Sequence, residues 1–204
     1  MIRETILTTV GADGCLHITP IGIIADGDGW VIAPFRPSTT LDNLRAVPFA
    51  VANHTDDVRI FAGCLTGRHE WPTRASDNVP VPRLTAALAH AELAVIGITE
   101  DEQRPRFRCA VVSRGLHAPF EGFNRAQAAV IEAAILVSRL HMLPREKIES
   151  EIGYLQTVVE KTAGAQEAEA WGWLMEAIRA HYDKAESTAS QALIHRPVCD
   201  GSAT

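Results

Sequence analysis

The sequence has 204 residues, of which 47% are hydrophobic and 22% charged, and its formal net charge is −6. This composition is typical of a soluble globular chain with a sizeable core, and the absence of a Lys/Arg-rich run excludes a general nucleic-acid-binding or anionic-membrane surface. No apolar run approaches the roughly 18 residues of a membrane span and the N-terminus shows no signal-peptide pattern, so we expect a cytoplasmic protein.

The first third of the chain predicts a β-meander of three strands. Residues 2–10, 16–25 and 30–33 are rich in β-branched and other apolar residues, and turns containing Asp-Gly separate them. Pro20 and Gly22 interrupt the second strand, which indicates an edge or a bulge that another group approaches closely.

Three more strands are expected over residues 48–53, 91–100 and 106–113. Between the first two of these lie a short helix capped by Thr55 and a long polar loop at 66–84. Six strands with few helices between them indicate a small antiparallel barrel.

Three consecutive hydroxyl residues, Ser38, Thr39 and Thr40, open another short helix. A helix start offers unpaired backbone N–H groups and partial positive charge, and Arg36 stands just upstream. These residues therefore form a candidate pocket for a phosphate dianion. The alternative, which stays open at this point, is that Ser38 or Thr39 only caps a surface helix, with Asp42 closing a capping box.

The chain changes character near residue 120. Residues 125–141 predict a helix with a broad apolar surface, Pro144 starts a second helix, and residues 165–184 predict a third. Helices with such short connections pack as an antiparallel cluster, against the barrel or against a partner subunit. The expected organisation is a barrel over residues 1–119, a helical cluster over 120–184 and a disordered tail over 185–204.

No metal centre is expected. The four cysteines lie far apart and no Cys-x-x-Cys pair occurs. His54 beside Asp56 and Asp57 is the densest cluster of ligand types, and solvated loop polarity explains it better than a bound metal.

Four motifs stand in order along the chain. They are Thr19-Pro20-Ile21-Gly22, Pro34-Phe35-Arg36-Pro37-Ser38-Thr39-Thr40 with Asn43-Leu44, Asn53-His54-Thr55-Asp56-Asp57, and Phe123-Asn124-Arg125-Ala126 with Glu132-Ala133-Ala134 and Ser138-Arg139-Leu140. Together, over residues 2–183, they resemble a domain-of-unknown-function family of FMN-binding split-barrel proteins, found mainly in methanogenic archaea and in methylotrophic or related bacteria. The barrel of that family is similar to that of pyridoxamine-phosphate oxidases and flavin reductases.

The resemblance implies a six-stranded antiparallel split β-barrel followed by a C-terminal helical cluster, with FMN as cofactor. It also implies a homodimer that holds FMN in a groove at the subunit interface. The implied phosphate cradle is Arg36, Ser38, Thr39 and Thr40. The implied contacts to the remainder of FMN come from Thr19, Pro20, Ile21, Gly22, Asn43, Asn53 and Thr55. Asn43 keeps a second interpretation as the cap of a neighbouring turn, and Asn53 keeps one as a strand-end turn former.

No residue stands out as a general acid or base, so no catalytic residue is predicted. The resemblance favours an FMN-dependent oxidoreductase of unassigned substrate and suggests, by association only, a link to pterin-dependent one-carbon metabolism. Two alternatives stay open: a flavin-binding module without turnover, such as a carrier or sensor, and a protein that binds the deazaflavin F420 in the same barrel. Neither a nucleic acid nor a membrane is an expected partner.

Overall fold

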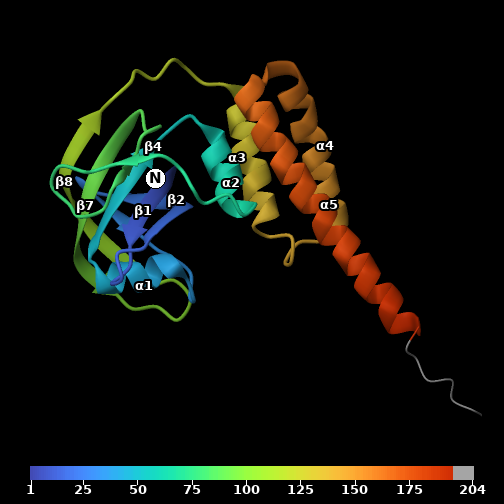
Figure 1. The fold of residues 1–204 in the computed structure, drawn as a ribbon, viewed down its shortest axis with the longest axis horizontal. Coiled ribbons are helices and arrows are strands. Elements are labelled where there is room, and N and C mark those ends of the chain that lie inside the picture. The colour runs from blue at the N-terminus through green and yellow to red at the C-terminus, as the bar shows by residue number, and fades with distance from the viewer. Residues whose placement is uncertain (195–204) are drawn as a thin grey trace, which may run out of the picture.

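The computed structural model describes residues 1–194 and contains all six predicted strands in one closed antiparallel barrel. The strands are β1 (Ile2–Val10), β2 (Leu16–Asp26), β3 (Gly29–Ile32), β4 (Phe49–His54), β7 (Ala89–Thr99) and β8 (Arg106–Leu116). Their order around the barrel is β1-β2-β3-β8-β7-β4, and β4 closes back on β1 (Figure 1). The predicted fold, a six-stranded antiparallel barrel followed by helices, is confirmed.

Alternate side chains of the strands fill the barrel, because successive side chains of an extended chain point to opposite faces. The fully buried interior residues include Leu7, Ile23, Ile32, Leu93 and Phe107. Helix α1 (Thr39–Ala46) covers one end of the barrel, where its Leu41 and Leu44 join this core (Figure 1).

Helix α2 (Val58–Leu65) lies between the barrel and the C-terminal helices and is apolar on two sides. Ile60 and Phe61 pack against outer side chains of β1 and β2. Val58 and Ala62 instead pack against the C-terminal helices. The helix therefore ties the two parts of the molecule together through apolar burial on both of its faces.

Asp57, not Thr55, caps α2. The Asp57 side chain accepts a hydrogen bond from the backbone N–H of Arg59 at 3.2 Å, and the Thr55 hydroxyl accepts one from the N–H of Asp57 at 3.1 Å. Because Thr and Asp are both favoured N-cap residues, the sequence pattern fits either position and only the path of the chain decides between them.

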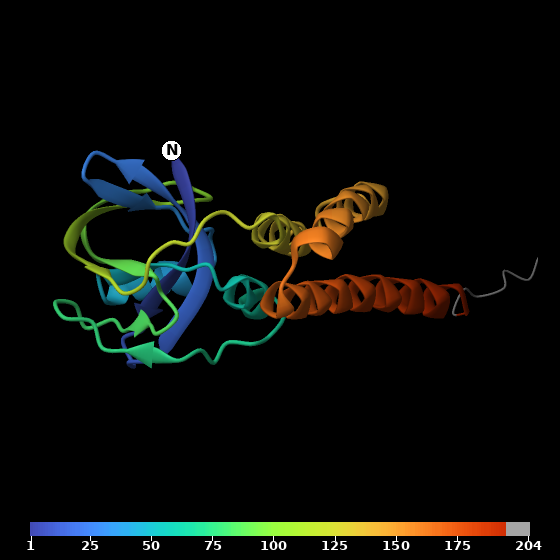
Figure 2. The same cartoon turned by 90° about the horizontal axis from the view of Figure 1, so that it is seen from above.

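The C-terminal helices are α3 (Arg125–Val137), α4 (Arg145–Thr162) and α5 (Ala165–Ile194), and they stand on one side of the barrel (Figure 2). Alanines along α3 allow the buried Trp171 and Leu174 of α5 to pack closely against it. Among residues 1–194, no helix is long and apolar enough to cross a membrane.

Helix α5 continues to Ile194, past its predicted end at residue 184, so residues 185–194 are helical and not a disordered tail. They contain neither Gly nor Pro, and an established helix extends through such a segment at little cost. The remainder of the predicted tail, 195–204, lies outside the described residues.

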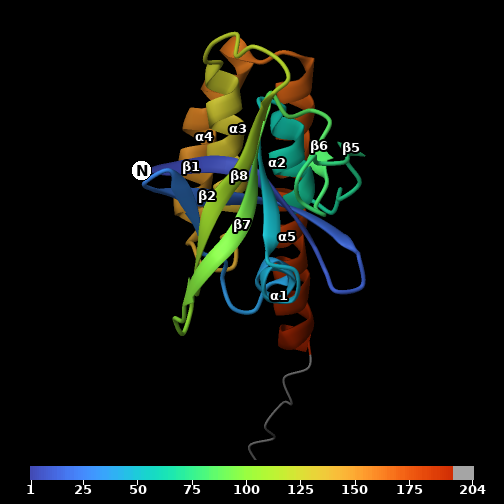
Figure 3. The same ribbon diagram turned by 90° about the vertical axis from the view of Figure 1, so that its left-hand side faces the viewer.

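The long loop at 66–84 wraps over the outer face of the barrel. It carries two short strands that the sequence did not predict, β5 (Thr73–Arg74) and β6 (Arg83–Leu84), which pair with each other. Val79 and Val81 are buried against β4. Figure 3 shows β5 and β6 at the edge of the barrel, beside α2.

Candidate functional site

The start of α1 offers a set of hydrogen-bond donors at one end of the barrel. Ser38 is the N-cap, and its Oγ accepts a hydrogen bond from the backbone N–H of Leu41 at 3.3 Å. Asp42 lies one position beyond the place that closes a capping box. In the described part of the chain, the backbone N–H groups of Thr39 and Thr40 have no acceptor. The capping interpretation of Ser38 is therefore confirmed, and two free N–H groups with partial positive charge remain beside the hydroxyls.

The charge of Arg36 is already engaged. Its guanidinium pairs with Glu100 and donates from Nε to the carbonyl oxygen of Asp101 at 3.0 Å. Arg45 donates to both carboxylate oxygens of Glu100, at 2.8 and 2.9 Å. Arg36 shares a surface hollow of ≈ 530 Å³ with Glu100, Asp101 and Glu102, so acidic groups outnumber the one arginine there.

The pair between Arg36 and Glu100 is nevertheless a surface contact. The Glu100 side chain is 62% exposed and that of Arg36 is 33% exposed. Ion pairs in such positions contribute about 0–1 kcal/mol. A phosphate dianion at the start of α1 would therefore compete with Glu100 for Arg36 at small cost.

The predicted residues Thr19 to Gly22 lie on an open edge of β2. Residues 2–10 of β1 pair with β2 along its whole other edge, whereas β3 pairs only with Ile24, Ala25 and Asp26. Half of the backbone donors and acceptors of this part of β2 are thus left for another molecule. Pro20 needs no partner for its nitrogen, which fits an unpaired edge.

Gly22 has a packing role as well. A Cβ atom built at Gly22 would stand 2.8 Å from Cγ2 of Ile2 and 3.0 Å from Oε1 of Glu4, both on the neighbouring strand. Close packing against β1 is therefore sufficient to explain why residue 22 is a glycine. Ile21 packs against the barrel core and offers only its backbone to a ligand.

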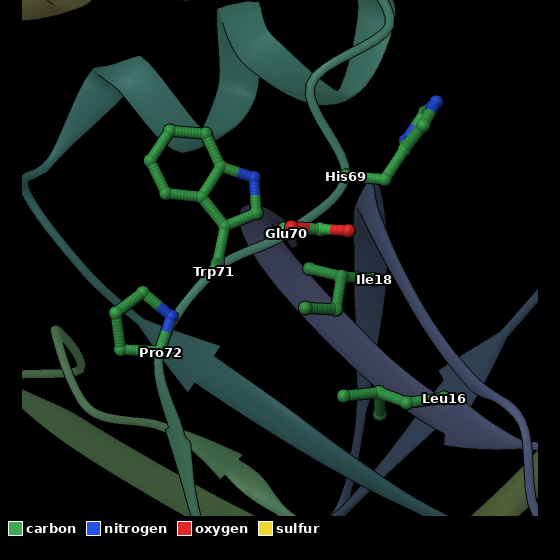
Figure 4. Close-up of a pocket in the computed structure, with 6 residues that line it drawn as sticks. All are labelled: Leu16, Ile18, His69, Glu70, Trp71 and Pro72. Atoms are coloured by element: carbon green, nitrogen blue, oxygen red, sulfur yellow. The ribbon is translucent and has the colours of Figure 1, made fainter.

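A second hollow, of ≈ 490 Å³, lies beside the first residues of β2. It is lined by Leu16, Ile18, His69, Glu70, Trp71 and Pro72 (Figure 4). The indole of Trp71 is fixed by a hydrogen bond from its Nε1 to the carbonyl oxygen of Arg68, at 3.0 Å. Apolar walls with a few polar groups at the rim are typical of small-molecule pockets. Both His69 and Trp71 belong to the long loop at 66–84.

Asn53 and Thr55, which were predicted to contact the cofactor, have structural roles. The Asn53 side chain is fully buried; its Oδ1 accepts from the N–H of Leu84 at 2.8 Å and its Nδ2 donates to the carbonyl oxygen of Ile6 at 3.0 Å. The Thr55 hydroxyl donates to the carbonyl oxygen of Ala86 at 2.8 Å. Because Asn53 is buried and its hydrogen bonds are satisfied, it has nothing left to offer a ligand, whereas the half-buried Thr55 is tied to the loop by its hydroxyl.

Asn43 is also directed inward. Its side chain is buried, and Nδ2 donates to Oγ1 of Thr9 on β1 at 3.1 Å. The bond fixes α1 on the end of the barrel. Of the predicted residues, the structure thus brings Arg36, Ser38, Thr39 and Thr40 together at the start of α1, and it places Thr19 to Gly22 on β2, with which α1 makes direct contact.

Sequence reasoning missed a buried polar cluster on the outer face of β7. The carboxylate of Glu92 is fully buried and accepts hydrogen bonds from the N–H groups of Asp77 and Asn78 at 2.9 and 2.8 Å. Burial alone would raise the pKa of Glu92, but hydrogen bonds from these two N–H groups, from His90 and from the Asn78 side chain together outweigh it, and the pKa is lowered. Nδ1 of His90 lies 2.8 Å from Nε2 of His117. The cluster holds the long loop against the barrel, and a glutamate in an apolar strand was its one signal in the sequence.

Comparison with known families gives two adjacent matches. The family described as "Protein of unknown function (DUF447) N-terminal domain" matches residues 3–118, and the one described as "Protein of unknown function (DUF447)" matches residues 124–176. No curated protein matches the chain.

Several solved structures are similar. The FMN-bound protein MM1853 from Methanosarcina mazei matches with a TM-score of 0.76 and 23% identity, over 86% of this chain and 94% of that chain. Two others match over less of this chain. They are the 2-nitrobenzoate 2-nitroreductase of Pseudomonas fluorescens (TM-score 0.48, 20% identity, 56% and 64% covered) and the flavoredoxin of Methanosarcina acetivorans (0.49, 11%, 57% and 69%). The similarity to the protein from M. mazei extends through the barrel and the helices and shows that the two chains share a fold.

Proposed function

Because the chain belongs to the DUF447 family, we propose that it is an FMN-binding flavoprotein, and more specifically an FMN-dependent oxidoreductase of unassigned substrate. The observation that carries the proposal is the pair of free N–H groups at Thr39 and Thr40, beside three hydroxyls and next to the open edge of β2. FMN bound by other members of this fold, as in the protein from M. mazei, is the precedent. A link to one-carbon metabolism rests on the family resemblance alone.

The residues at the start of α1 fit a phosphate monoester. Thr39 would donate from its backbone and its hydroxyl and the buried Thr40 from its backbone, and Arg36 adds a charge-assisted hydrogen bond when it turns from Glu100. The free backbone groups at Thr19 to Gly22 suit the polar edge of a planar ring. FMN, when bound, supplies hydride and one-electron transfer, and the chain's own part is to hold its phosphate and to shield one side of its ring.

We further propose that the protein is a homodimer. The open edge of β2 lacks a neighbour over most of its length. Large apolar side chains on the barrel surface are also uncovered, among them Phe35, Ile96 and Val112, exposed by 61%, 58% and 47%. A second copy that covers them would bury ~2,000 Å² or more in an obligate dimer. Sedimentation analysis at micromolar concentration tests this directly, and a monomer would contradict it.

The absorbance spectrum of freshly purified protein tests the cofactor. We expect a flavin spectrum for the wild type, and a spectrum without the flavin bands for the Ser38→Ala, Thr39→Ala double variant. Loss of the Ser38 cap costs about 1 kcal/mol, so circular dichroism must show that the double variant is folded. Thr157→Ala on the exposed surface of α4 is the matched control and should keep the flavin. A double variant that is folded and fully loaded would exclude this cradle.

The alternative, a flavin carrier or sensor without turnover, is favoured by one feature of the site. In the part of the chain that the structure describes, no histidine or carboxylate other than Asp42 and the Glu100–Glu102 group is placed at the start of α1. Anaerobic reduction of the loaded protein by NADH or NADPH separates the two functions. Oxidation of the nucleotide no faster than with free FMN would support the carrier. A spectrum of the deazaflavin type would instead identify F420 as the ligand.

A further inference from the structure

The end of the barrel opposite α1 gathers positively charged side chains around its opening, where Arg3 and Arg114 are exposed. Arg3 alternates with Thr5 and Leu7 on the inward face of β1, and His54 follows the core residue Ala52 by two positions on β4. Trp30 of β3 is itself part of the interior core. Since side chains of a strand alternate with a period of two, all of these groups face the same space.

Arg114 reaches this space because of an irregularity between β7 and β8. Leu93 is opposite Val111, but Glu92 is opposite Ser113, so β8 holds one extra residue at this point. The bulge reverses the alternation beyond it. Arg114 therefore stands opposite Ala91, an interior residue, and its side chain comes to the inward face.

The indole nitrogen of Trp30 has no partner at this end. Trp30 is 9% exposed, and its Nε1 finds no hydrogen-bond acceptor among the described residues. Its ring lies across the barrel from that of His54, with 6.5 Å between the ring centroids. A buried N–H without an acceptor is uncommon in proteins and calls for a ligand or a bound water.

Among the described residues, neither Arg3 nor Arg114 forms an ion pair with a carboxylate. Burial, followed by the positive charges of Arg3, Arg114 and His90, lowers the pKa of His54. No carboxylate among the described residues pairs with Arg3, and Arg114 donates only to the backbone carbonyl oxygen of Asp28, at 3.2 Å.

Acidic side chains of the neighbouring strands are engaged elsewhere, whereas Asp28, whose carbonyl oxygen accepts from Arg114, lies at the rim of this end. Asp26 lies 3.7 Å from the guanidinium of Arg108, and Glu92 is enclosed on the outer face of β7. Glu4 alternates with Arg3 on β1 and points to the outer side, next to Gly22. The gathering of Arg3, His54 and Arg114 at one end is therefore a property of the folded barrel and not of the composition, since the whole chain is acidic.

We propose that Arg3, Trp30, His54 and Arg114, together the basic mouth of the barrel, bind the anionic group of a small molecule, a phosphate or a carboxylate. Two guanidinium groups and an indole N–H supply donors to such an oxyanion. The imidazole of His54 would take up a proton from solvent as the anion arrives, because the negative charge offsets the two arginines. The basic mouth is distinct from the start of α1 and does not depend on the proposed FMN site.

NMR of the histidine side chains in the full chain tests this proposal. The probes are sodium phosphate and sodium acetate, each compared with sodium chloride at equal ionic strength. We expect phosphate, acetate or both to raise the pKa of His54 in a saturable manner that chloride does not reproduce. The response to phosphate or to acetate alone would assign the source of the anion. No saturable change with either probe would overturn the proposal.

Charge-removing variants add a readout that does not rely on His54. Arg3→Gln and Arg114→Gln should each weaken the affinity for the effective probe at least about fivefold, because each removes a charge-assisted donor. Arg106→Gln, on the exposed start of β8 at the other end of the barrel, is the matched control and should bind normally. Equal losses in all three variants would mean general attraction to a positive surface and would overturn the site.

A repeat of the titration with saturating FMN separates this proposal from the proposed cofactor site. If FMN and phosphate bind independently, both sites stand. If FMN displaces phosphate and itself raises the pKa of His54, the basic mouth is supported and the placement of the FMN phosphate at α1 is wrong.

Discussion

The two ends of the barrel are closed by different means. At the α1 end, Leu41 and Leu44 complete the apolar core, Asn43 is bonded to Thr9, and the arginines outside are paired with Glu100. At the opposite end, Arg3, His54 and Arg114 lie around the opening with the indole of Trp30, whose N–H has no acceptor among the described residues. The first arrangement stabilises the fold, whereas the second leaves charge unpaired that a ligand could satisfy.

The largest expected effect is on the free energy of unfolding and concerns the end of the barrel that α1 covers. Leu44→Ala removes a side chain that is 1% exposed and leaves a cavity between α1 and the core, so the free energy of unfolding should fall by about 2–5 kcal/mol. Urea denaturation measures the change. Leu116→Ala, at a position 79% exposed, is the control and should change it by less than about 0.5 kcal/mol. A loss below that level at Leu44 would mean that α1 is not part of the core.

The second effect concerns the buried hydrogen bonds that join β4 to β1 and to the long loop. Asn53→Ala leaves the N–H of Leu84 and the carbonyl oxygen of Ile6 without their partner in a buried place. The free energy of unfolding should fall by about 2–3 kcal/mol, while the FMN affinity of the folded fraction should stay unchanged. Urea denaturation and a flavin fluorescence titration give the two values. A variant of normal stability that binds FMN poorly would restore Asn53 as a ligand.

These expectations separate what the sequence predicts from what it does not. The six strands and α1 follow from local signals, namely β-branched runs, turns containing Asp-Gly and the hydroxyls at Ser38 to Thr40. Contacts between distant residues give no such signal: Glu100 meets Arg36 across 64 positions, and Asn53 meets Leu84 across 31. The inward direction of Arg114 depends on a one-residue bulge, which reverses the alternation from which a face would be predicted.

The third prediction concerns a substitution that leaves arginines unpaired at the α1 end, as they are in the basic mouth. Glu100→Gln releases Arg36 and Arg45 from their shared carboxylate, so both can turn toward a phosphate at Thr39. Because surface pairs of this kind contribute at most about 1 kcal/mol, FMN should bind roughly two- to fivefold more tightly. Glu102→Gln removes the same charge from the same hollow and is the control. Equal tightening in both variants would show that net charge, and not the release of Arg36, is responsible.

The smallest effect is the dependence of stability on pH, and it concerns the basic mouth. The pKa of His54 is lowered in the folded protein, first by burial and then by Arg3, Arg114 and His90. Below the unfolded value of about 6.5, the unfolded chain therefore binds a proton that the native state resists, and the free energy of unfolding decreases as the pH falls toward the lower native pKa. Burial lowers the pKa of His17 and His117 as well, so they contribute in the same direction.

The contribution of the basic mouth to the slope of the free energy of unfolding against pH can be isolated. Arg3→Gln removes one positive charge that opposes protonation of His54, so stability should fall less between pH 7.5 and 5.5 than in the wild type. A phosphate concentration that saturates the basic mouth should reduce the slope further, because it favours the imidazolium that the arginines disfavour. Arg106→Gln should leave the slope unchanged. If urea denaturation at the two pH values gives the same slope for Arg3→Gln as for the wild type, Arg3 does not act on His54, and the contrast between the two ends of the barrel would then rest on Trp30 and Arg114 alone.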